Sequence, residues 1–354
     1  MKILIVTDAW TPQINGVVRT LQATGRELRA MGHDVTMITP EGHRTVACPS
    51  YPEIRLTRAA GGVAQRTIEA CAPDAIHIAT EGPLGLATRR YCLRNGLAFT
   101  TSFHTRFAEY VHVRWRVPLA VSYAWLRWFH APATAVMVAT PSMRAELIAR
   151  GFERTVLWTR GVDLQTFSPG PGIPLYSPGP VLMAVGRVAI EKNLRAFLDL
   201  DLDAVCRAAG AGSKWVVGDG PQLEALRTAY PQVRYVGAQT TLLADYYRAA
   251  DVVVFPSRTD TFGLVLLEAM ACGTPVAAYP VPGPLDVVAD SPGGALDPDL
   301  GKAVRRALGL RREDARARAL TFSWARATTQ FTQNLVRVGA ARLATRTDRV
   351  RVSG

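Results

Sequence analysis

Residues 251–278 decide the fold most clearly; they read Asp251-Val-Val-Val-Phe-Pro-Ser-Arg-Thr-Asp-Thr-Phe-Gly-Leu-Val-Leu-Leu-Glu-Ala-Met-Ala-Cys-Gly-Thr-Pro-Val-Ala-Ala278. The apolar run 251–255 predicts a buried strand, and the apolar segment 264–272 predicts a helix. Residues 274–278 predict a second strand, so the stretch is a strand–helix–strand unit. Such units place their strands parallel in one sheet, with helices on its faces.

The same alternation extends outward from this unit. Further strands are predicted at 2–6, 34–39, 75–79, 98–102, 135–139, 156–158, 181–185, 214–217 and 233–236. Helical patterns lie between several of them, at 16–32, 83–94 and 141–150. Residues 199–213 are irregular for a helix-to-strand connection. The sequence therefore predicts an α/β fold with two parallel sheets.

A segment rich in Pro and Gly separates the two series. Five of the 14 residues of 167–180 are Pro and three are Gly, which is typical of a linker. We expect an amino-terminal domain at 1–166, a linker at 167–180, a carboxyl-terminal domain at 181–320, a helix at 321–345 that packs back on the first domain, and a tail at 346–354.

The composition narrows the class of protein. The 354 residues include 41 basic and 29 acidic side chains, a net charge of +12. This excess permits nucleic acid, a membrane surface or a phosphorylated substrate as partner. The basic residues are dispersed and no nucleic-acid motif is present, so we expect no nucleic-acid partner.

The sequence lacks the features of several other kinds of protein and binding site. No apolar stretch reaches the ~20 residues that span a bilayer, and the amino terminus does not resemble a secretory signal. The five cysteines are scattered without a CxxC pair, which favours a reducing compartment over a metal cluster or disulfide scaffold. Neither a GxGxxG fingerprint nor a GxxxxGK[ST] loop is present.

Two loops that follow predicted strands carry groups suited to a diphosphate. Gly16 lies between a strand and a helix, where backbone amides favour an anion, although an ordinary turn would look the same. Arg187 ends a strand and Lys192 lies five residues further on, and the two cations can converge on one phosphate group. Two solvated charges flanking a turn are the alternative.

The loop and helix at 256–275 carry the strongest pattern. Asp260 lies in the loop and Glu268 on the following helix, and carboxylates of this kind accept hydrogen bonds from sugar hydroxyls. The amides of Thr261, Phe262, Gly263 and Leu264 begin the helix and suit phosphate. Because the neighbours of Glu268 are apolar, its carboxylate requires a partner.

Together, segments 256–275, 186–193, 15–17 and 160–163 resemble glycosyltransferase family 4. Segments 80–85 and 279–286 are similar to the branch with GDP-mannose-dependent mannosyltransferases and diacylglycerol glycosyltransferases, including sulfoquinovosyl and glucuronosyl types. The resemblance implies the GT-B architecture, α/β with two facing Rossmann-like domains and a cleft between them. It also implies retaining transfer of a hexose.

The resemblance assigns roles to the donor residues. Arg187 and Lys192 would hold the diphosphate of a nucleotide sugar, GDP-mannose or a UDP-sugar, and Gly16 would bring amides to it. Glu268 would bind the ribose hydroxyls. Asp260, where the family more often has Glu, would contact the transferred sugar together with the amides of 261–264.

A histidine and the absence of a metal motif complete the implied mechanism. His104 matches the family histidine that reaches the transferred sugar. The acceptor hydroxyl would attack on the face from which the diphosphate departs, and the protein would supply positioning and charge. We expect no metal and no cofactor besides the nucleotide-sugar co-substrate.

Residues 81–130 suggest a membrane surface, because they contain seven Arg against two acidic residues and because 114–130 mixes basic with aromatic side chains. We expect this region to dock on an anionic leaflet, at the cytoplasmic face of the inner membrane, and to admit a lipid acceptor such as diacylglycerol or phosphatidylinositol. The candidate residues are Glu81, Arg106, Arg114, Trp115, Arg116, Trp125 and Trp128. A core helix that contains Trp125, Trp128 and Phe129 is the alternative.

The sequence is also compatible with other functions. The acceptor could be soluble or a polysaccharide, and a nucleotide-sugar epimerase or a phosphorylase could use a similar scaffold. The donor base, the donor sugar, the linkage and the oligomeric state are not decided by these motifs.

Overall fold

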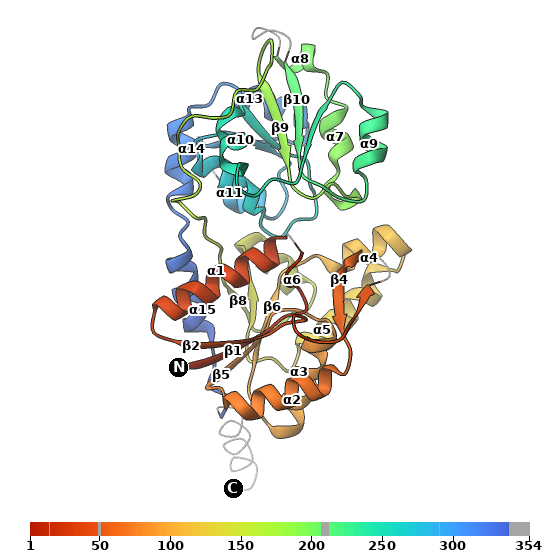
Figure 1. Ribbon diagram of the computed structural model, residues 1–354, viewed down its shortest axis with the longest axis vertical. Coiled ribbons are helices and arrows are strands. Elements are labelled where there is room, and N and C mark those ends of the chain that lie inside the picture. Colours follow the sequence, from red (N-terminus) through yellow and green to blue (C-terminus); the bar gives the residue numbers. More distant parts are fainter. Residues whose placement is uncertain (14, 49–50, 207–211, 290, 340–354) are drawn as a thin grey trace. The chain divides into compact units, whose positions relative to one another are not determined.

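The computed structural model describes residues 1–354 except 14, 49–50, 207–211, 290 and 340–354. The chain divides into two compact units (Figure 1). Unit 1 contains Met1–Thr159 together with the described residues from Ala325 onward, and unit 2 contains Arg160–Trp324. Each unit is an α/β structure around a parallel sheet, so the predicted fold class is confirmed.

Unit 1 has a six-stranded parallel sheet in the order β2-β1-β5-β6-β7-β8. The strands are β1 (Lys2–Val6), β2 (Asp34–Ile38), β5 (Ala75–Ile78), β6 (Thr100–Phe103), β7 (Val136–Val138) and β8 (Thr155–Leu157). An antiparallel pair lies outside this sheet, β3 (Thr45–Cys48) with β4 (Tyr51–Thr57). The helices are α1 (Gly16–Ala30), α2 (Ala60–Cys71), α3 (Pro83–Asn95), α4 (Phe107–Trp115), α5 (Leu119–His130), α6 (Pro141–Ala149) and α15 (Trp324–Asn334).

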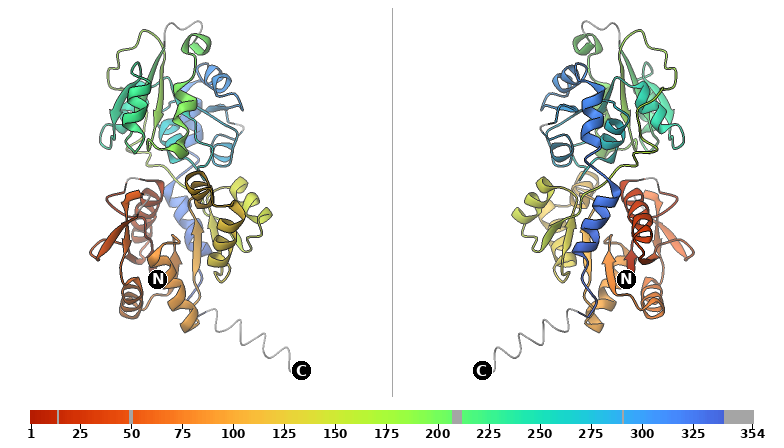
Figure 2. Two further views of the ribbon diagram at one scale, coloured as in Figure 1. Left: turned by 90° about the vertical axis from the view of Figure 1, so that its right-hand side faces the viewer. Right: turned by 90° about the vertical axis from the view of Figure 1, so that its left-hand side faces the viewer.

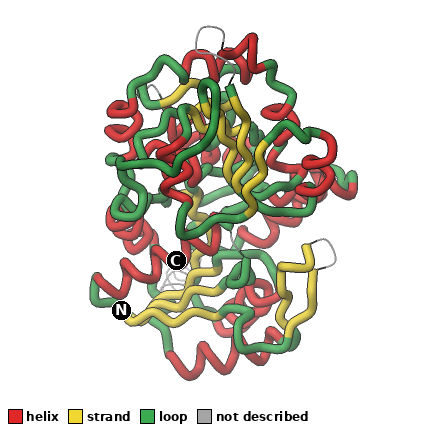
Figure 3. Tube along the Cα trace, turned by 45° about the horizontal axis from the view of Figure 1, so that its top comes forward, coloured by secondary structure: helices red, strands yellow, loops and turns green. Residues whose placement is uncertain are grey.

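Alternate side chains of β1 enter different hydrophobic clusters, as the two-residue period of a strand requires. Leu4 and Val6 of β1 pack in the cluster that α2 and α3 complete. Ile3 and Ile5 pack in the cluster that α1 and Phe331 of α15 complete. Helices therefore cover both faces of the sheet, as Figures 2 and 3 show.

Unit 2 repeats this plan with the strand order β11-β10-β9-β12-β13-β14, all parallel. The strands are β9 (Val181–Val185), β10 (Ser213–Val217), β11 (Arg234–Gly237), β12 (Val252–Phe255), β13 (Val276–Ala278) and β14 (Gly294–Leu296). The helices are η1 (Ile190–Lys192), α7 (Leu194–Leu198), α8 (Leu202–Cys206), α9 (Leu223–Ala229), α10 (Leu243–Ala249), α11 (Leu264–Ala271), α12 (Pro284–Val288), α13 (Leu300–Ala307) and α14 (Arg312–Ala319).

The predicted strands are present, most of them within two residues of the expected bounds. The β3–β4 pair and β14 were not predicted, because β3 and β4 lack a continuous apolar run and β14 has only three residues. Part of the irregular segment 199–213 forms the short helix α8, and its residues 207–211 lie outside the described chain.

The Pro-rich segment 167–180 belongs to unit 2 and is fastened to it by backbone contacts. The Arg248 guanidinium donates to the Ser168 carbonyl at 2.7 Å, and Arg316 donates to the Phe167 carbonyl at 2.9 Å. The division of the chain therefore lies between residues 159 and 160, before the expected linker.

Helix α15 packs within unit 1 through Phe331, which is fully buried against Trp158 and His77. The helix ends at Asn334, earlier than expected, because the chain then turns to an extended course. There Val338 donates its amide to Asp74 and accepts from Ala98. Residues 340–345 of the expected helix lie outside the described chain.

Asp8 fastens the loop after β1 to the start of α3. Its carboxylate accepts hydrogen bonds from the amides of Leu84 at 2.8 Å and Gly85 at 3.3 Å, and from the hydroxyl of Thr80 at 3.0 Å. Gly85 is required here, because a Cβ would lie 1.9 Å from the Thr80 carbonyl oxygen. Burial raises the pKa of Asp8 to about 6, although these hydrogen bonds act in the opposite direction.

The raised pKa of Asp8 predicts a pH-dependent stability of unit 1. Because the folded-state value lies above the ordinary 3.8, the carboxyl contribution to stability is present below about pH 4 and is lost as the pH rises through about 6. The free energy of unfolding of wild type relative to Asp8→Asn should therefore fall between pH 4 and pH 7 by up to about 3 kcal/mol. Urea denaturation at both pH values measures this, with the exposed Asp34→Asn as control. Parallel pH profiles for wild type and Asp8→Asn would contradict it.

Candidate active site

The carboxyl edge of the unit 2 sheet has a point where the strand order reverses. Strand β9 lies between β10 and β12. The chain continues from β9 to β10 and β11 on one side, and then crosses over to β12 on the other side. Open parallel sheets bind ligands at such points, beyond the carboxyl ends of the strands. The loops that follow β9 and β12, 186–193 and 256–263, are those that carry the predicted donor residues.

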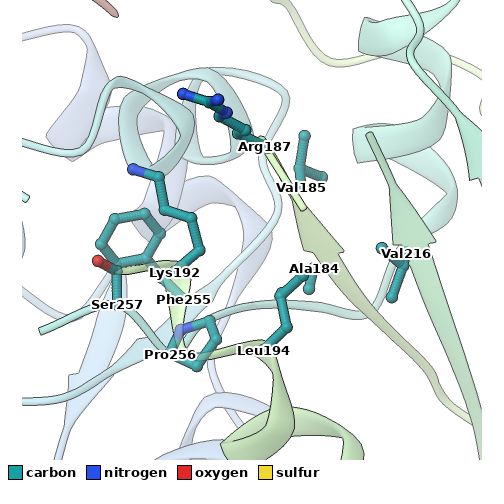
Figure 4. Close-up of a pocket in the computed structure, with 10 residues that line it drawn as sticks. Ala184, Val185, Arg187, Lys192, Leu194, Val216, Phe255, Pro256 and Ser257 are labelled. Atoms are coloured by element: carbon teal, nitrogen blue, oxygen red, sulfur yellow. The ribbon is translucent and has the colours of Figure 1, made fainter. Parts of the chain in front are cut away.

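A small pocket lies where these two loops meet (Figure 4). Its lining includes Gly186, Arg187 and Lys192 after β9, and Pro256 and Ser257 after β12. In Figure 4 the side chains of Arg187 and Lys192 extend toward the same side of the pocket. The fold therefore brings two cations to one edge of the sheet.

Lys192 and Asp260 form an ion pair across the two loops. The Lys192 Nζ donates to Asp260 Oδ1 at 2.6 Å, and the two side chains are 25% and 17% exposed. The other carboxylate oxygen of Asp260, Oδ2, is buried and has no hydrogen-bond partner in the described part of the chain. The ion pair thus joins Asp260, the candidate for contacting the sugar, to Lys192, the candidate for binding the phosphate.

Side chains near the pair lock the two loops together. Asn193 donates its amide to the Pro256 carbonyl at 3.0 Å, and the Thr259 hydroxyl donates to the Glu191 carbonyl at 3.1 Å. These contacts join the two loops at residues next to Lys192 and Asp260.

Helix α11 begins beside this pair without a capping side chain. Its N-cap is Gly263, with a φ of 89°, a left-handed conformation that favours glycine. The helix start therefore directs amides and the positive end of the helix dipole toward this edge of the sheet. Phe262 is buried, and Thr261 and Leu264 are partly exposed.

Glu268 on α11 is 5% exposed. A carboxylate buried among apolar side chains needs a hydrogen-bond partner, and Glu268 has one. The Tyr247 hydroxyl of α10 donates to Glu268 Oε2 at 2.9 Å. Tyr247 is itself fully buried. No local pattern points to Tyr247, because it lies 21 residues away from Glu268 on another helix.

In unit 1, Gly16 and His104 follow strands at the corresponding edge. Gly16 is the first residue of α1, but the Asn15 side chain accepts hydrogen bonds from the amides of Val17 and Val18, at 3.0 Å each. These two amides are therefore already used. His104 is partly buried, and its ring meets the ring of Trp158 edge-on, with centroids 5.4 Å apart.

Arg106 does not face solvent as a membrane-docking residue would. It is 9% exposed and donates both terminal nitrogens to Glu146, at 3.0 and 2.8 Å, and one of them to Glu109 at 3.1 Å. Burial opposes its charge, but the two carboxylates raise the net pKa of Arg106 above its usual value. Its role in the described structure is to hold α4 and α6 together.

The other candidates on α4 and α5 divide between surface and core. Arg114, Trp115 and Arg116 are exposed, and Trp128 is 52% exposed. Trp125 is partly buried and stacks on the fully buried Phe129. The core-helix alternative therefore holds for Phe129 and in part for Trp125, but not for Trp128.

Cys92 and Cys272 are buried. Burial raises the pKa of Cys92 and of Cys272 to about 12, so both thiols stay protonated near neutral pH. In the part of the chain that is described, no three His, Cys, Asp or Glu side chains gather as metal ligands do.

Comparisons with known proteins agree with this arrangement. Residues 14–166 match the family "Glycosyltransferase Family 4", and residues 179–309 match "Glycosyl transferases group 1". A GDP-mannose-dependent alpha-mannosyltransferase of Mycobacterium tuberculosis is 29% identical, over 84% of this chain and 84% of the relative. A sulfoquinovosyl transferase of Arabidopsis thaliana is also 29% identical, over 79% of this chain and 60% of the relative.

A solved structure supports the same fold. Sucrose-phosphate synthase from Thermosynechococcus elongatus aligns with a TM-score of 0.71 and 22% identity, over 94% of this chain and 97% of that one. The resemblance found in the motifs is thus confirmed by both halves of the chain. With its GT-B fold, the chain belongs to glycosyltransferase family 4 and is a glycosyltransferase.

Proposed function

We propose that this glycosyltransferase moves a hexose from GDP-mannose or a UDP-sugar to a hydroxyl group of a membrane lipid. Diacylglycerol and phosphatidylinositol are the acceptors that we propose. The anomeric configuration is retained and no metal takes part. The enzyme works as a peripheral protein at the cytoplasmic face of the inner membrane.

The ion pair between Lys192 and Asp260 carries the donor part of the proposal. A nucleotide sugar presents a diphosphate next to a hexose, and the pair presents a cation next to a carboxylate. Lys192 and Arg187 bind the diphosphate, and the amides at the start of α11 add to them. Asp260 accepts hydrogen bonds from the hexose hydroxyls, and Glu268 accepts from the ribose hydroxyls.

Transfer needs charge stabilisation rather than a protein nucleophile. As the bond from sugar to phosphate breaks, negative charge grows on the leaving diphosphate, where Lys192 and Arg187 stabilise it. The departing phosphate oxygen takes the proton of the acceptor hydroxyl, which attacks from the same face. His104 assists as a contact to the transferred sugar, a role that stays a prediction from the family resemblance.

The surface of α4 and α5 supports a lipid acceptor. These helices expose five large apolar side chains: Phe107, Val113, Trp115, Val121 and Trp128. Arg114 and Arg116 lie among them and are also exposed. Interfacial aromatics with basic neighbours favour an anionic bilayer surface. None of the helices in the described residues is long and apolar enough to cross a membrane.

A donor and acceptor panel tests the proposal directly. GDP-mannose, UDP-glucose, UDP-galactose and UDP-glucuronate are each offered with diacylglycerol or phosphatidylinositol, and products are read by lipid mass spectrometry. We expect one donor to give a glycolipid, with the donor anomeric configuration by NMR and without added metal. If no donor yields product or hydrolysis and Glu268→Ala behaves like wild type, the proposal fails.

Replacing Lys192 tests the diphosphate contact. Lys192→Met keeps the length of the side chain but removes its charge, so kcat/KM for transfer should fall about 100-fold, as in other losses of transition-state charge stabilisation. The matched control is Lys302→Met, an exposed lysine on α13 of the same unit. Equal activity of the two variants would contradict the assignment.

Replacing Glu268 tests the ribose contact. Glu268→Gln keeps an acceptor for Tyr247 but loses the charge, so the Kd for the accepted donor should rise about tenfold in calorimetric titration, with little change in Tm. Glu224→Gln, an exposed carboxylate on α9, is the control and should bind as wild type. A wild-type Kd for Glu268→Gln would place ribose recognition elsewhere.

Vesicle flotation tests the docking surface. Trp115→Ser/Trp128→Ser should lose most binding to phosphatidylglycerol vesicles, and Arg114→Glu/Arg116→Glu should lose its preference over phosphatidylcholine. The controls are Leu320→Ser, an exposed apolar residue of unit 2, and Arg26→Glu/Arg234→Glu, which changes the net charge equally. Equal flotation of surface variants and controls would overturn the assignment of this surface.

A further inference from the structure

A carboxylate and a buried histidine are paired at the carboxyl edge of the unit 1 sheet. Glu81 lies in the loop after β5, and its Oε1 is 3.3 Å from the Nε2 of His130 at the end of α5. The Glu81 side chain is 19% exposed and that of His130 is 2% exposed. The carboxylate is thus accessible, and the ring behind it is not.

The His130 ring is held from several sides. Its Nδ1 lies 2.9 Å from the hydroxyl of Thr101 in β6, at hydrogen-bonding distance. Phe129, Phe103 and Phe152 surround it, with ring centroids 5.1, 6.4 and 5.9 Å away. The ring therefore presents its Nε2 to Glu81 in one orientation, and in the described part of the chain this buried nitrogen has no hydrogen-bond partner of its own.

The backbone beside Glu81 is equally constrained. The Thr80 hydroxyl donates to the Asp8 carboxylate at 3.0 Å and accepts from the Asp8 backbone amide at 2.7 Å. The following residues enter α3, whose first amides are bound by the same Asp8 carboxylate. Glu81 therefore stands on a rigid loop, next to the β6 loop that carries His104, because β5 and β6 are neighbours.

Glu81 differs from the other carboxylates of this part of unit 1. Glu109 and Glu146 are engaged by Arg106, and further by Tyr123 and Arg150. In the described part of the chain, Glu81 has no Lys or Arg within ion-pair distance. Its accessible lone pairs remain able to accept hydrogen bonds from a substrate.

We propose that Glu81 binds a hydroxyl group of the acceptor and that His130 positions it for this contact. The inference rests on the proposed function and identifies the chemistry of the acceptor subsite as a polyol hydroxyl, from a glycerol or an inositol. His130 acts through Glu81 and is a positioning residue.

Two substitutions of His130 separate positioning from packing. His130→Gln places an amide near the former Nε2 and still reaches Glu81. His130→Asn places its amide near the former Nδ1 and reaches only Thr101. The acceptor KM should rise about tenfold in His130→Asn and stay near wild type in His130→Gln, while the donor KM is unchanged in both.

Glu81→Gln and a double variant complete the test. Glu81→Gln should raise the acceptor KM, and Glu81→Gln/His130→Asn should raise it no further, because the second residue acts through the first. The control is His77→Gln. His77 is also fully buried, but it contacts Thr100 and Ser102 on the other face of the sheet. This change should lower Tm and leave the acceptor KM as in wild type.

The readout is lipid product formed from diacylglycerol or phosphatidylinositol in mixed micelles, with donor hydrolysis measured in parallel. If wild type transfers sugar but His130→Asn and Glu81→Gln keep its acceptor KM, this inference is overturned and the proposed function stands. Equal rises in His130→Gln and His130→Asn also overturn the positioning role. If wild type transfers to neither lipid while it hydrolyses the donor, both the lipid acceptor and this inference fall.

Discussion

The reversal of strand order in each parallel sheet is the constraint on which the sites of this protein depend. In unit 2 it falls between β9 and β12, and in unit 1 between β1 and β5. Because parallel strands end at one edge, the loops at these points bring together residues that are far apart in sequence. Lys192 and Asp260 meet in this way in unit 2, and Asp8 and Thr80 meet in unit 1.

Helix starts at these edges differ in how their amides are satisfied. Asn15 caps α1, and Asp8 binds the first amides of α3. Helix α11 instead begins at Gly263, which has no side chain to cap it. The positive end of the α11 dipole thus lies beside the loop that carries Asp260, whereas amides at the other two helix starts are bound by Asn15 and Asp8.

Many of the arginines behind the net charge act inside the two units. Arg89 donates to the carbonyls of Trp128 and Phe129, and Arg318 donates to those of Asp286 and Val287. A guanidinium has five donors in a planar fork, so one side chain can satisfy several carbonyls at a helix end. Some of the arginines that contribute to the net charge of +12 therefore serve internal packing.

The sequence by itself determined the two parallel sheets, because buried strands are continuous apolar runs and the loops after them carry Gly, Pro and charged residues. It also determined the candidate donor residues and the family, through motifs that are local in the chain. The tertiary structure alone decided which side chains meet: Tyr247 with Glu268, His130 with Glu81, and Lys192 with Asp260. It also turned Arg106 inward, against the expectation of a surface role. These outcomes depend on packing between elements distant in sequence, whose side-chain directions a local pattern does not contain.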